Sequence, residues 1–158
     1  MTTIALIGSF RKHYNTVLDV LDMFRKAGII ILTPLGTPII KPGMPFVRFT
    51  SDPSQLEDYI VQTITMERIF RADLTYVVAP GGYVGRTTCY EIGRIIQAAR
   101  PLYFTDYLQD LPIRIPESHI LSPIELIENL KSGNLKLKSL FMDNRDEYSR
   151  IERSIIDG

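Results

Sequence analysis

The sequence has little of what metal sites, disulfides and nucleic-acid surfaces require. It contains one cysteine and two histidines in 158 residues. One cysteine makes neither an internal disulfide nor a multi-cysteine zinc site, and two distant histidines make no histidine-rich metal site. Eighteen basic residues balance eighteen acidic ones, so the basic excess typical of nucleic-acid binders is missing. We therefore expect no metal, no cofactor and no nucleic-acid partner.

The sequence also lacks a long apolar run. No stretch approaches the roughly 18 apolar residues that cross a membrane. The first residues carry no basic segment ahead of one short apolar run, which argues against a signal peptide. Apolar residues make up 45% of the chain and charged residues 23%, as in globular proteins. We expect a cytoplasmic protein with no membrane partner, one domain over residues 1–142 and a charged tail over residues 143–158.

Short apolar runs alternate with segments of helical periodicity. Such runs, bounded by glycine or proline, are typical of buried parallel strands, and the alternation predicts an α/β fold. We expect a three-layer sandwich around a mainly parallel sheet of four to five strands. The expected strands are residues 4–7, 29–32, 74–79 and 101–104, with 119–121 as a candidate edge strand. Helices are expected over residues 17–28, from Ser51-Asp52-Pro53 to 70, from 87 or 88 to 99, and from 123 to 133, where Ser122 and Glu125 form a capping-box pattern.

Ligands of parallel sheets bind beyond the carboxyl ends of the strands. Three segments follow expected strands at that edge, namely residues 8–14, 34–52 and 80–91. The second contains four prolines and two glycines, and long loops of this kind are often functional. We therefore look for chemistry in these three segments.

The first segment, Gly8-Ser9-Phe10-Arg11-Lys12, lies between a strand and a helix. Glycine permits close backbone approach, Ser9 offers a hydroxyl, and Arg11 offers a planar fork for a phosphate. The helix N-terminus that follows adds amide donors for an anion. The alternative is an ordinary turn with solvated cations, and this segment alone favours that alternative.

The third segment holds a glycine-rich loop before a helix. Three glycines lie in the five positions 81–85, which predicts a tight bend against a ligand. The helix begins near Thr87 or Thr88 by this pattern, which places Glu91 in the first turn or just after it. The alternative is that Thr88-x-x-Glu91 is a capping box, in which the carboxylate only satisfies a backbone amide. Its position at the same sheet edge as Gly8 favours the functional interpretation.

These segments together resemble the nucleoside 2-deoxyribosyltransferase-like superfamily, which includes 2′-deoxynucleoside 5′-phosphate N-hydrolases. The resemblance covers about residues 3–106. Three features carry it: the opening Gly8-Ser9-Phe10-Arg11 segment, the Ala72-Asp73 junction before the third strand, and the block Gly85-x-Thr87-x-x-x-Glu91-x-Gly93 with Arg100-Pro101 beyond it.

The resemblance implies a flavodoxin-like fold that cleaves the N-glycosidic bond of a nucleoside or nucleotide, with Glu91 as the nucleophile at the anomeric carbon. The sugar then passes to water in a hydrolase or to another base in a transferase. A carboxylate is suited to this chemistry because it stabilises or traps a cation-like sugar. The substrate-binding residues would be Gly8, Ser9, Arg11, Gly82, Tyr83, Gly85 and Thr87, of which Ser9 and Arg11 favour a 5′-monophosphate. The resemblance also implies a homodimer. A weaker resemblance, of Pro80-Gly81-Gly82-Tyr83 to cytokinin-activating phosphoribohydrolases, predicts cleavage of the same bond.

The sequence departs from the family at the expected acid. The family commonly carries an aspartate about two turns before the Ala-Asp junction, and Thr65 stands there. Glu67 points to a different face of the helix, and Asp58 lies about 10 Å away along the axis. The alternative function is therefore a nucleotide sensor that binds without catalysis, and a third interpretation is a scaffold with no small ligand.

Overall fold

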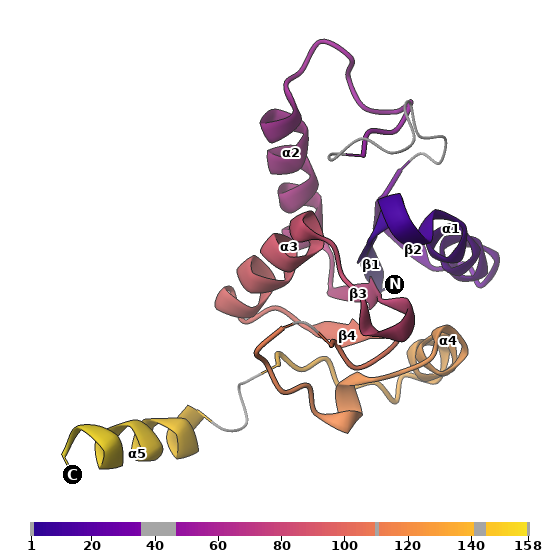
Figure 1. Cartoon of the computed structure of the whole chain (residues 1–158). Coiled ribbons are helices and arrows are strands. Elements are labelled where there is room, and N and C mark those ends of the chain that lie inside the picture. Colours follow the sequence, from indigo (N-terminus) through magenta and orange to yellow (C-terminus); the bar gives the residue numbers. More distant parts are fainter. Residues whose placement is uncertain (1, 36–46, 110, 141–144, 158) are drawn as a thin grey trace.

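The computed structural model describes residues 2–35, 47–109, 111–140 and 145–157, and it shows a central sheet with helices on both faces (Figure 1). The sheet has four strands, all parallel, in the order β2-β1-β3-β4. The strands are β1 (Thr3–Gly8), β2 (Ile30–Thr33), β3 (Leu74–Val78) and β4 (Leu102–Phe104). The predicted α/β three-layer architecture is confirmed.

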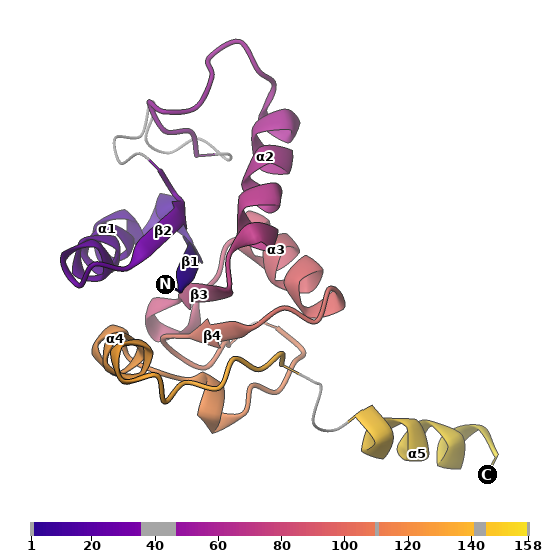
Figure 2. The same cartoon turned by 180° about the vertical axis from the view of Figure 1, so that it is seen from behind.

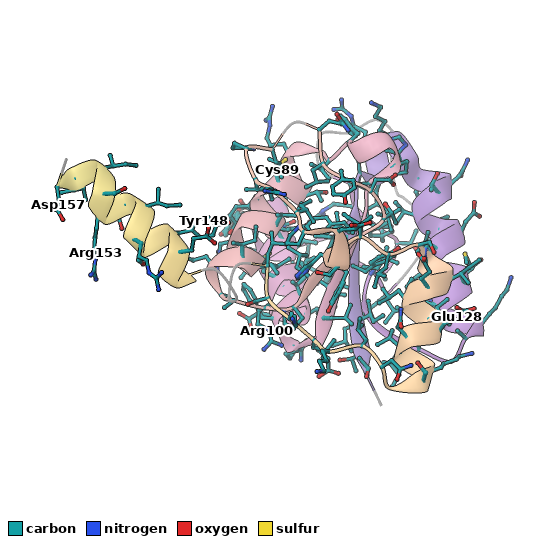
Figure 3. The ribbon with its side chains drawn as sticks, turned by 90° about the horizontal axis from the view of Figure 1, so that it is seen from below. Cys89, Arg100, Glu128, Tyr148, Arg153 and Asp157 are labelled. Atoms are coloured by element: carbon teal, nitrogen blue, oxygen red, sulfur yellow. The ribbon has the colours of Figure 1, made fainter. Side chains whose placement is uncertain are left out.

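The helices divide between the two faces of the sheet, as Figures 1 and 2 show from opposite sides. One face is covered by α1 (Phe10–Lys26) and α4 (Pro123–Ser132), the other by α2 (Asp58–Arg71) and α3 (Arg86–Gln97). A last helix, α5 (Arg145–Ile156), stands clear of the sheet and the other helices, with Asp157 at its end away from the body (Figure 3).

Two apolar layers hold the sheet between its helices. Successive residues of β1 point to opposite faces, so Ile4 and Leu6 pack with α1 and α4, whereas Ala5 and Ile7 pack with α2 and α3. Burial on both faces explains why the central strands read as continuous apolar runs. The carboxyl edge of the sheet is thereby placed between the two helical layers.

Two helices begin at other positions than the sequence predicts. The helix α1 begins at Phe10 rather than near residue 17, because the buried Ser9 caps it and accepts the N–H of Lys12 at 3.4 Å. The helix α2 begins at Asp58, beyond the predicted Ser51-Asp52-Pro53 start. There the Asp52 carboxylate accepts the N–H of Phe49 at 2.8 Å, which closes a turn instead of capping a helix.

The last part of the body matches the sequence in some respects. The candidate edge strand over residues 119–121 is reduced to one parallel bridge between Ile120 and Phe104, after a 3₁₀ turn at Glu117–His119. The predicted capping box at Ser122 and the glycine stop at Gly133 are both present around α4. The expected boundary between residues 142 and 143 lies outside the described residues.

Among the residues described, no helix combines the length and the apolar character needed to cross a membrane.

Candidate active site

The strands β1 and β3 lie side by side and end together, with Gly8 paired to Val78. A side chain at Gly8 does not fit there, since a Cβ atom would lie 2.6 Å from the carbonyl oxygen of Val78. Glycine therefore permits a close strand pairing at this position. The segments that follow the two strands leave the sheet at the same point and line one cavity.

A cavity of about 430 Å³ opens at this carboxyl edge. Its walls are the ends of β1 and β2, the first residues of α1 and α3, one face of α2 and the segment 47–52. Seven of the residues proposed from the sequence line it: Gly8, Ser9, Arg11, Tyr83, Gly85, Thr87 and Glu91. The fold therefore brings together residues from two segments that are about 70 positions apart.

Gly82 is the exception, because it lies outside the lining of this cavity. It is buried, has φ +79°, and approaches another loop so closely that a Cβ atom would lie 2.2 Å from the carbonyl oxygen of Tyr107. Its own carbonyl oxygen accepts the N–H of Gln109 at 3.1 Å. A glycine is required at this position by backbone packing against residues 107–109, rather than by a ligand.

Two helix N-termini meet at the cavity. Ser9 caps α1, and Gly85 precedes α3 without a capping side chain. The two caps are neighbours, since a Cβ atom at Gly85 would lie 3.4 Å from Ser9 Oγ. Neither helix has an acidic residue in its first turn, while Arg11 and Arg86 line the cavity beside them. Amide donors, helix dipoles and guanidinium groups together make this end of the cavity suited to an anion.

Tyr83 couples the two loops that carry these caps. The ammonium nitrogen of Lys12 lies 3.7 Å from the centre of the Tyr83 ring, and the His13 ring meets the same tyrosine edge-on at 5.7 Å. A cation above an aromatic face is attracted to it. These contacts fix the loop before α3 against the start of α1.

Glu91 lies inside α3 and takes no part in a cap. The helix begins at Arg86, so Glu91 is its sixth residue and Thr88 its third. The capping-box interpretation of Thr88 and Glu91 is therefore wrong, whereas the helix starts within two residues of the predicted position and places Glu91 just after the first turn, as expected. Glu91 is 5% exposed and contributes its carboxylate to the cavity wall.

The environment of Glu91 changes how it ionises. Burial raises the pKa of its carboxyl group from 4.5 to about 7, although a hydrogen bond from Gln62 opposes this shift. That bond joins Gln62 Nε2 to Glu91 Oε1 at 2.9 Å. Near neutral pH the carboxyl group is therefore present in both protonation states. A buried carboxyl group with a shifted pKa in a cleft is typical of a catalytic site.

One face of α2 forms the wall around this carboxyl group, through Val61, Gln62, Thr65 and Arg68. Thr65 Oγ1 donates its proton to the carbonyl oxygen of Val61 at 3.0 Å, so the hydroxyl proton is already in use. Glu67 is exposed and lies outside the lining. The position at which the resemblance implies an acid therefore offers no free proton.

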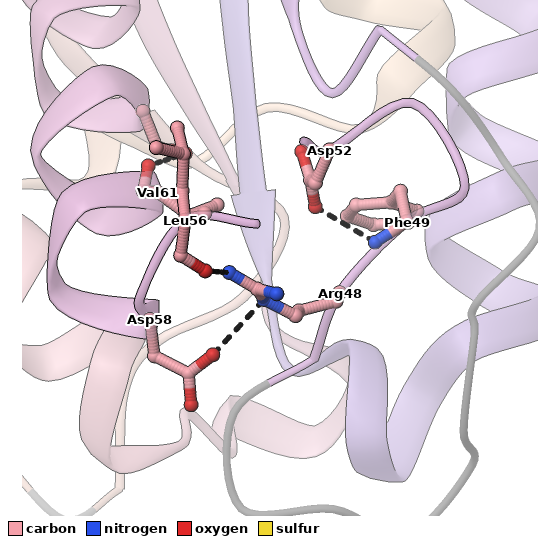
Figure 4. A network of polar contacts seen from close by, with 7 residues as sticks. Arg48, Phe49, Asp52, Leu56, Asp58 and Val61 are labelled. Atoms are coloured by element: carbon pink, nitrogen blue, oxygen red, sulfur yellow. Dashed lines mark hydrogen bonds and ion pairs between the residues drawn. The ribbon is translucent and has the colours of Figure 1, made fainter. Parts of the chain in front are cut away.

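The segment 47–57 is fastened to the start of α2 (Figure 4). Arg48 Nε lies 2.9 Å from the carboxylate of Asp58, and the same guanidinium group donates to the carbonyl oxygen of Leu56. Phe49 packs edge-on against Phe10 with ring centres 4.9 Å apart. These contacts place Asp52 at the cavity, where it and Glu91 are the two carboxyl groups of the described lining.

Sequence reasoning missed four charged or amide side chains of the lining: Asp52, Gln62, Arg68 and Arg86. Gln62 and Arg68 carried a usable signal, because they stand three residues on either side of Thr65 and such residues share a helix face. Asp52 carried none, since its place depends on contacts between the loop and α2.

The described residues contain no cluster of three or more histidine, cysteine, aspartate or glutamate side chains that would hold a metal ion. No protein-family model matches the chain, and no curated protein matches it in sequence. The family resemblance and the homodimer therefore stay predictions.

Proposed function

We propose that this cavity binds a nucleoside 5′-monophosphate and that Glu91 cleaves its N-glycosidic bond. The observation that carries the proposal is the buried carboxyl group with a pKa of about 7, located on the helix whose uncapped N-terminus faces the same cavity. A nucleotide needs an anion site at one end and a carboxylate near the anomeric carbon. This chain carries both on α3.

In the proposed complex, the phosphate lies at the N-termini of α1 and α3, beside Arg11 and Arg86. The sugar lies at Glu91, and the base extends towards α2 and Phe49. The ionised carboxylate attacks C1′, the bond to the base nitrogen breaks, and a glycosyl ester forms. Water then hydrolyses the ester and releases the sugar phosphate. In a transferase a second base takes the place of water.

The test is a chromatographic assay for free base. Ribo- and deoxyribonucleosides and their monophosphates are incubated with the wild-type protein, with Glu91→Gln, and with Glu125→Gln as a control outside the cavity. We expect base release from monophosphates by the wild type and Glu125→Gln proteins, and none by Glu91→Gln. Base release that survives in Glu91→Gln would refute the role of Glu91.

A second candidate is a nucleotide sensor that binds the same ligand without cleaving it. The observation in its favour is Thr65, whose hydroxyl proton is donated to Val61 and which replaces the expected acid. A sensor gives a thermal shift with nucleotides, since a ligand of the folded state stabilises it, but no base release from any of them.

A further inference from the structure

Arg68 brings a positive charge to the wall that faces the proposed base. It lies on the same face of α2 as Gln62 and Thr65, and it lines the cavity. Among the described residues its guanidinium group has no ion-pair partner, since Arg48 and Asp58 form the ion pair found there. The role of this cation is not explained by the phosphate site, which lies at the N-termini of α1 and α3.

Cleavage of the glycosidic bond leaves the bonding electron pair on the base. The enzyme must supply a proton to the base or stabilise its negative charge. On this wall, Thr65 donates to Val61 and Gln62 donates to Glu91. Arginine does not serve as a proton donor in proteins, but the N–H groups of the Arg68 guanidinium can bind and stabilise an anionic oxygen.

We propose, on the basis of the function proposed above, that Arg68 contacts the leaving base and selects nucleotides whose base carries a carbonyl group where cytosine and adenine carry an amino group, such as uracil, thymine or hypoxanthine. As Glu91 bonds to C1′, the C1′–N bond breaks and its electron pair moves to the ring nitrogen. The negative charge spreads to the carbonyl oxygen that faces the guanidinium group. The water that later hydrolyses the glycosyl ester gives OH to C1′, and its remaining proton neutralises the base.

Stabilising the anionic base and protonating the base favour opposite sets of substrates. Replacing a carbonyl group of the base by an amino group makes the departing anion less stable but makes the ring easier to protonate. Anion stabilisation therefore favours uracil over cytosine and hypoxanthine over adenine. Proton donation from a carboxylic acid favours cytosine and adenine instead. The order of substrates thus reports which group acts on the base.

The experiment measures kcat and KM for the monophosphates of uracil, 5-fluorouracil, cytosine, hypoxanthine and adenine. The proteins are the wild type, Arg68→Met, Arg68→Lys, and Arg71→Met as a matched control on the exposed side of α2. We expect the wild type to prefer uracil over cytosine and hypoxanthine over adenine. Arg68→Met lowers kcat for the uracil nucleotide about 100-fold, the usual loss when one charge-stabilising donor is removed. It lowers kcat less for 5-fluorouracil, which is a better leaving group, while Arg68→Lys retains part of the rate and Arg71→Met all of it.

Three outcomes overturn the inference. A preference for cytosine and adenine that disappears in Asp52→Asn assigns the leaving group to an acid, and the proposed function stands. An equal loss for all bases through a higher KM places Arg68 at the phosphate, and the proposed function again stands. No base release by the wild type from any substrate refutes the proposed function and this inference with it. If Arg68→Met does not fold, as judged by circular dichroism, the wild-type preference and Arg68→Lys decide between the same outcomes.

Discussion

Two glutamates of this chain share a local pattern and have opposite environments. In Ser122-x-x-Glu125 the serine is the helix cap, and both bonds of the capping box form, with Ser122 N–H donating to Glu125 Oε2 at 2.8 Å. Glu125 is exposed, and the hydrogen bonds from Ser122 lower the pKa of its carboxyl group. In Thr88-x-x-Glu91 neither bond forms, and burial raises the pKa of Glu91 to about 7.

The difference comes from where each helix begins. Pro123 sits at the first position of α4, where its fixed φ favours a helix start directly after Ser122. In α3 the helix begins one residue after Gly85, so Thr88 is already inside it. The same spacing therefore makes a cap in one helix and a buried carboxyl group in the other. Burial at the sheet edge, rather than the spacing, is what supports the proposed role of Glu91.

The largest expected effect separates the two glutamates by activity. We expect Glu91→Gln to lower kcat for base release by about 10³-fold or more, because removal of a nucleophile costs at least this much. Glu125→Gln should keep the wild-type rate, since Glu125 lies outside the cavity lining and its carboxylate binds Ser122 at the start of α4. Equal rates for the two variants in the chromatographic assay would contradict the comparison.

The next effect separates them by the pH dependence of stability. The carboxyl group of Glu91 ionises near 4.5 in the unfolded chain and near 7 in the folded protein, so the folded state loses stability as the pH rises between these values. Glu91→Gln escapes this loss, and at pH 8 its free energy of unfolding should exceed that of the wild type by about 3 kcal/mol. Urea unfolding at pH 4 and pH 8 measures the difference.

Glu125 should behave in the opposite way. Its pKa is lower in the folded protein, so its contribution to stability is present above the unfolded pKa and is lost as the pH falls. Glu125→Gln removes that contribution at neutral pH.

The prediction for Glu91 would be contradicted if Glu91→Gln were less stable than the wild type at pH 8 while unfolding with the same cooperativity. That result would mean that burial does not disfavour the ionised form of the Glu91 carboxyl group.

A smaller effect concerns the hydrogen bond from Gln62. Gln62→Leu removes the donor that favours the ionised form of Glu91. We expect the pKa of Glu91 to rise further, by about one unit, because a hydrogen bond to a charged group contributes about 1.5 kcal/mol or more. The titration of the side-chain carboxyl carbon by NMR measures this shift. Gln62→Glu is unsuitable, since it adds a charge, and an unchanged titration in Gln62→Leu would contradict the contact.

The smallest effect tests the two hydroxyl groups. Ser122→Ala should lower the free energy of unfolding by about 1 kcal/mol, the usual cost of losing an N-cap. Thr88→Val should cost less, since Thr88 caps nothing. Thermal unfolding measures the loss of stability in each variant. A larger loss in Thr88→Val than in Ser122→Ala would contradict the conclusion that Ser122 is a helix cap and Thr88 is not.

The layers of the fold follow from the sequence because their causes are local. The central strands are apolar on both faces, and Ser122, Pro123 and Gly133 mark the ends of α4 in the chain itself. The sequence also predicted that Ser9 and Glu91 lie at one sheet edge, since parallel strands place their carboxyl ends together. These predictions needed only periodicity, caps and topology.

The rest of the site depends on contacts between distant segments. Gln62 is placed beside Glu91 by the packing of α2 against α3, and Asp52 by the ion pair of Arg48 with Asp58. Gly82 lies in a glycine-rich segment of the kind that binds ligands, but its lack of a side chain is required by the close approach of the Tyr107 backbone. Sequence spacing does not encode which of these partners a residue meets in the folded chain.

The pH profile of kcat/KM for the best substrate of the wild-type protein tests the central claim most directly. If Glu91 acts as the nucleophile, its carboxylate must be ionised, so kcat/KM should rise with pH through a midpoint near 7. The midpoint should move upward in Gln62→Leu, which separates it from the titration of the substrate phosphate. A rate that falls as the pH rises through 7, or a midpoint unchanged in Gln62→Leu, would contradict the account.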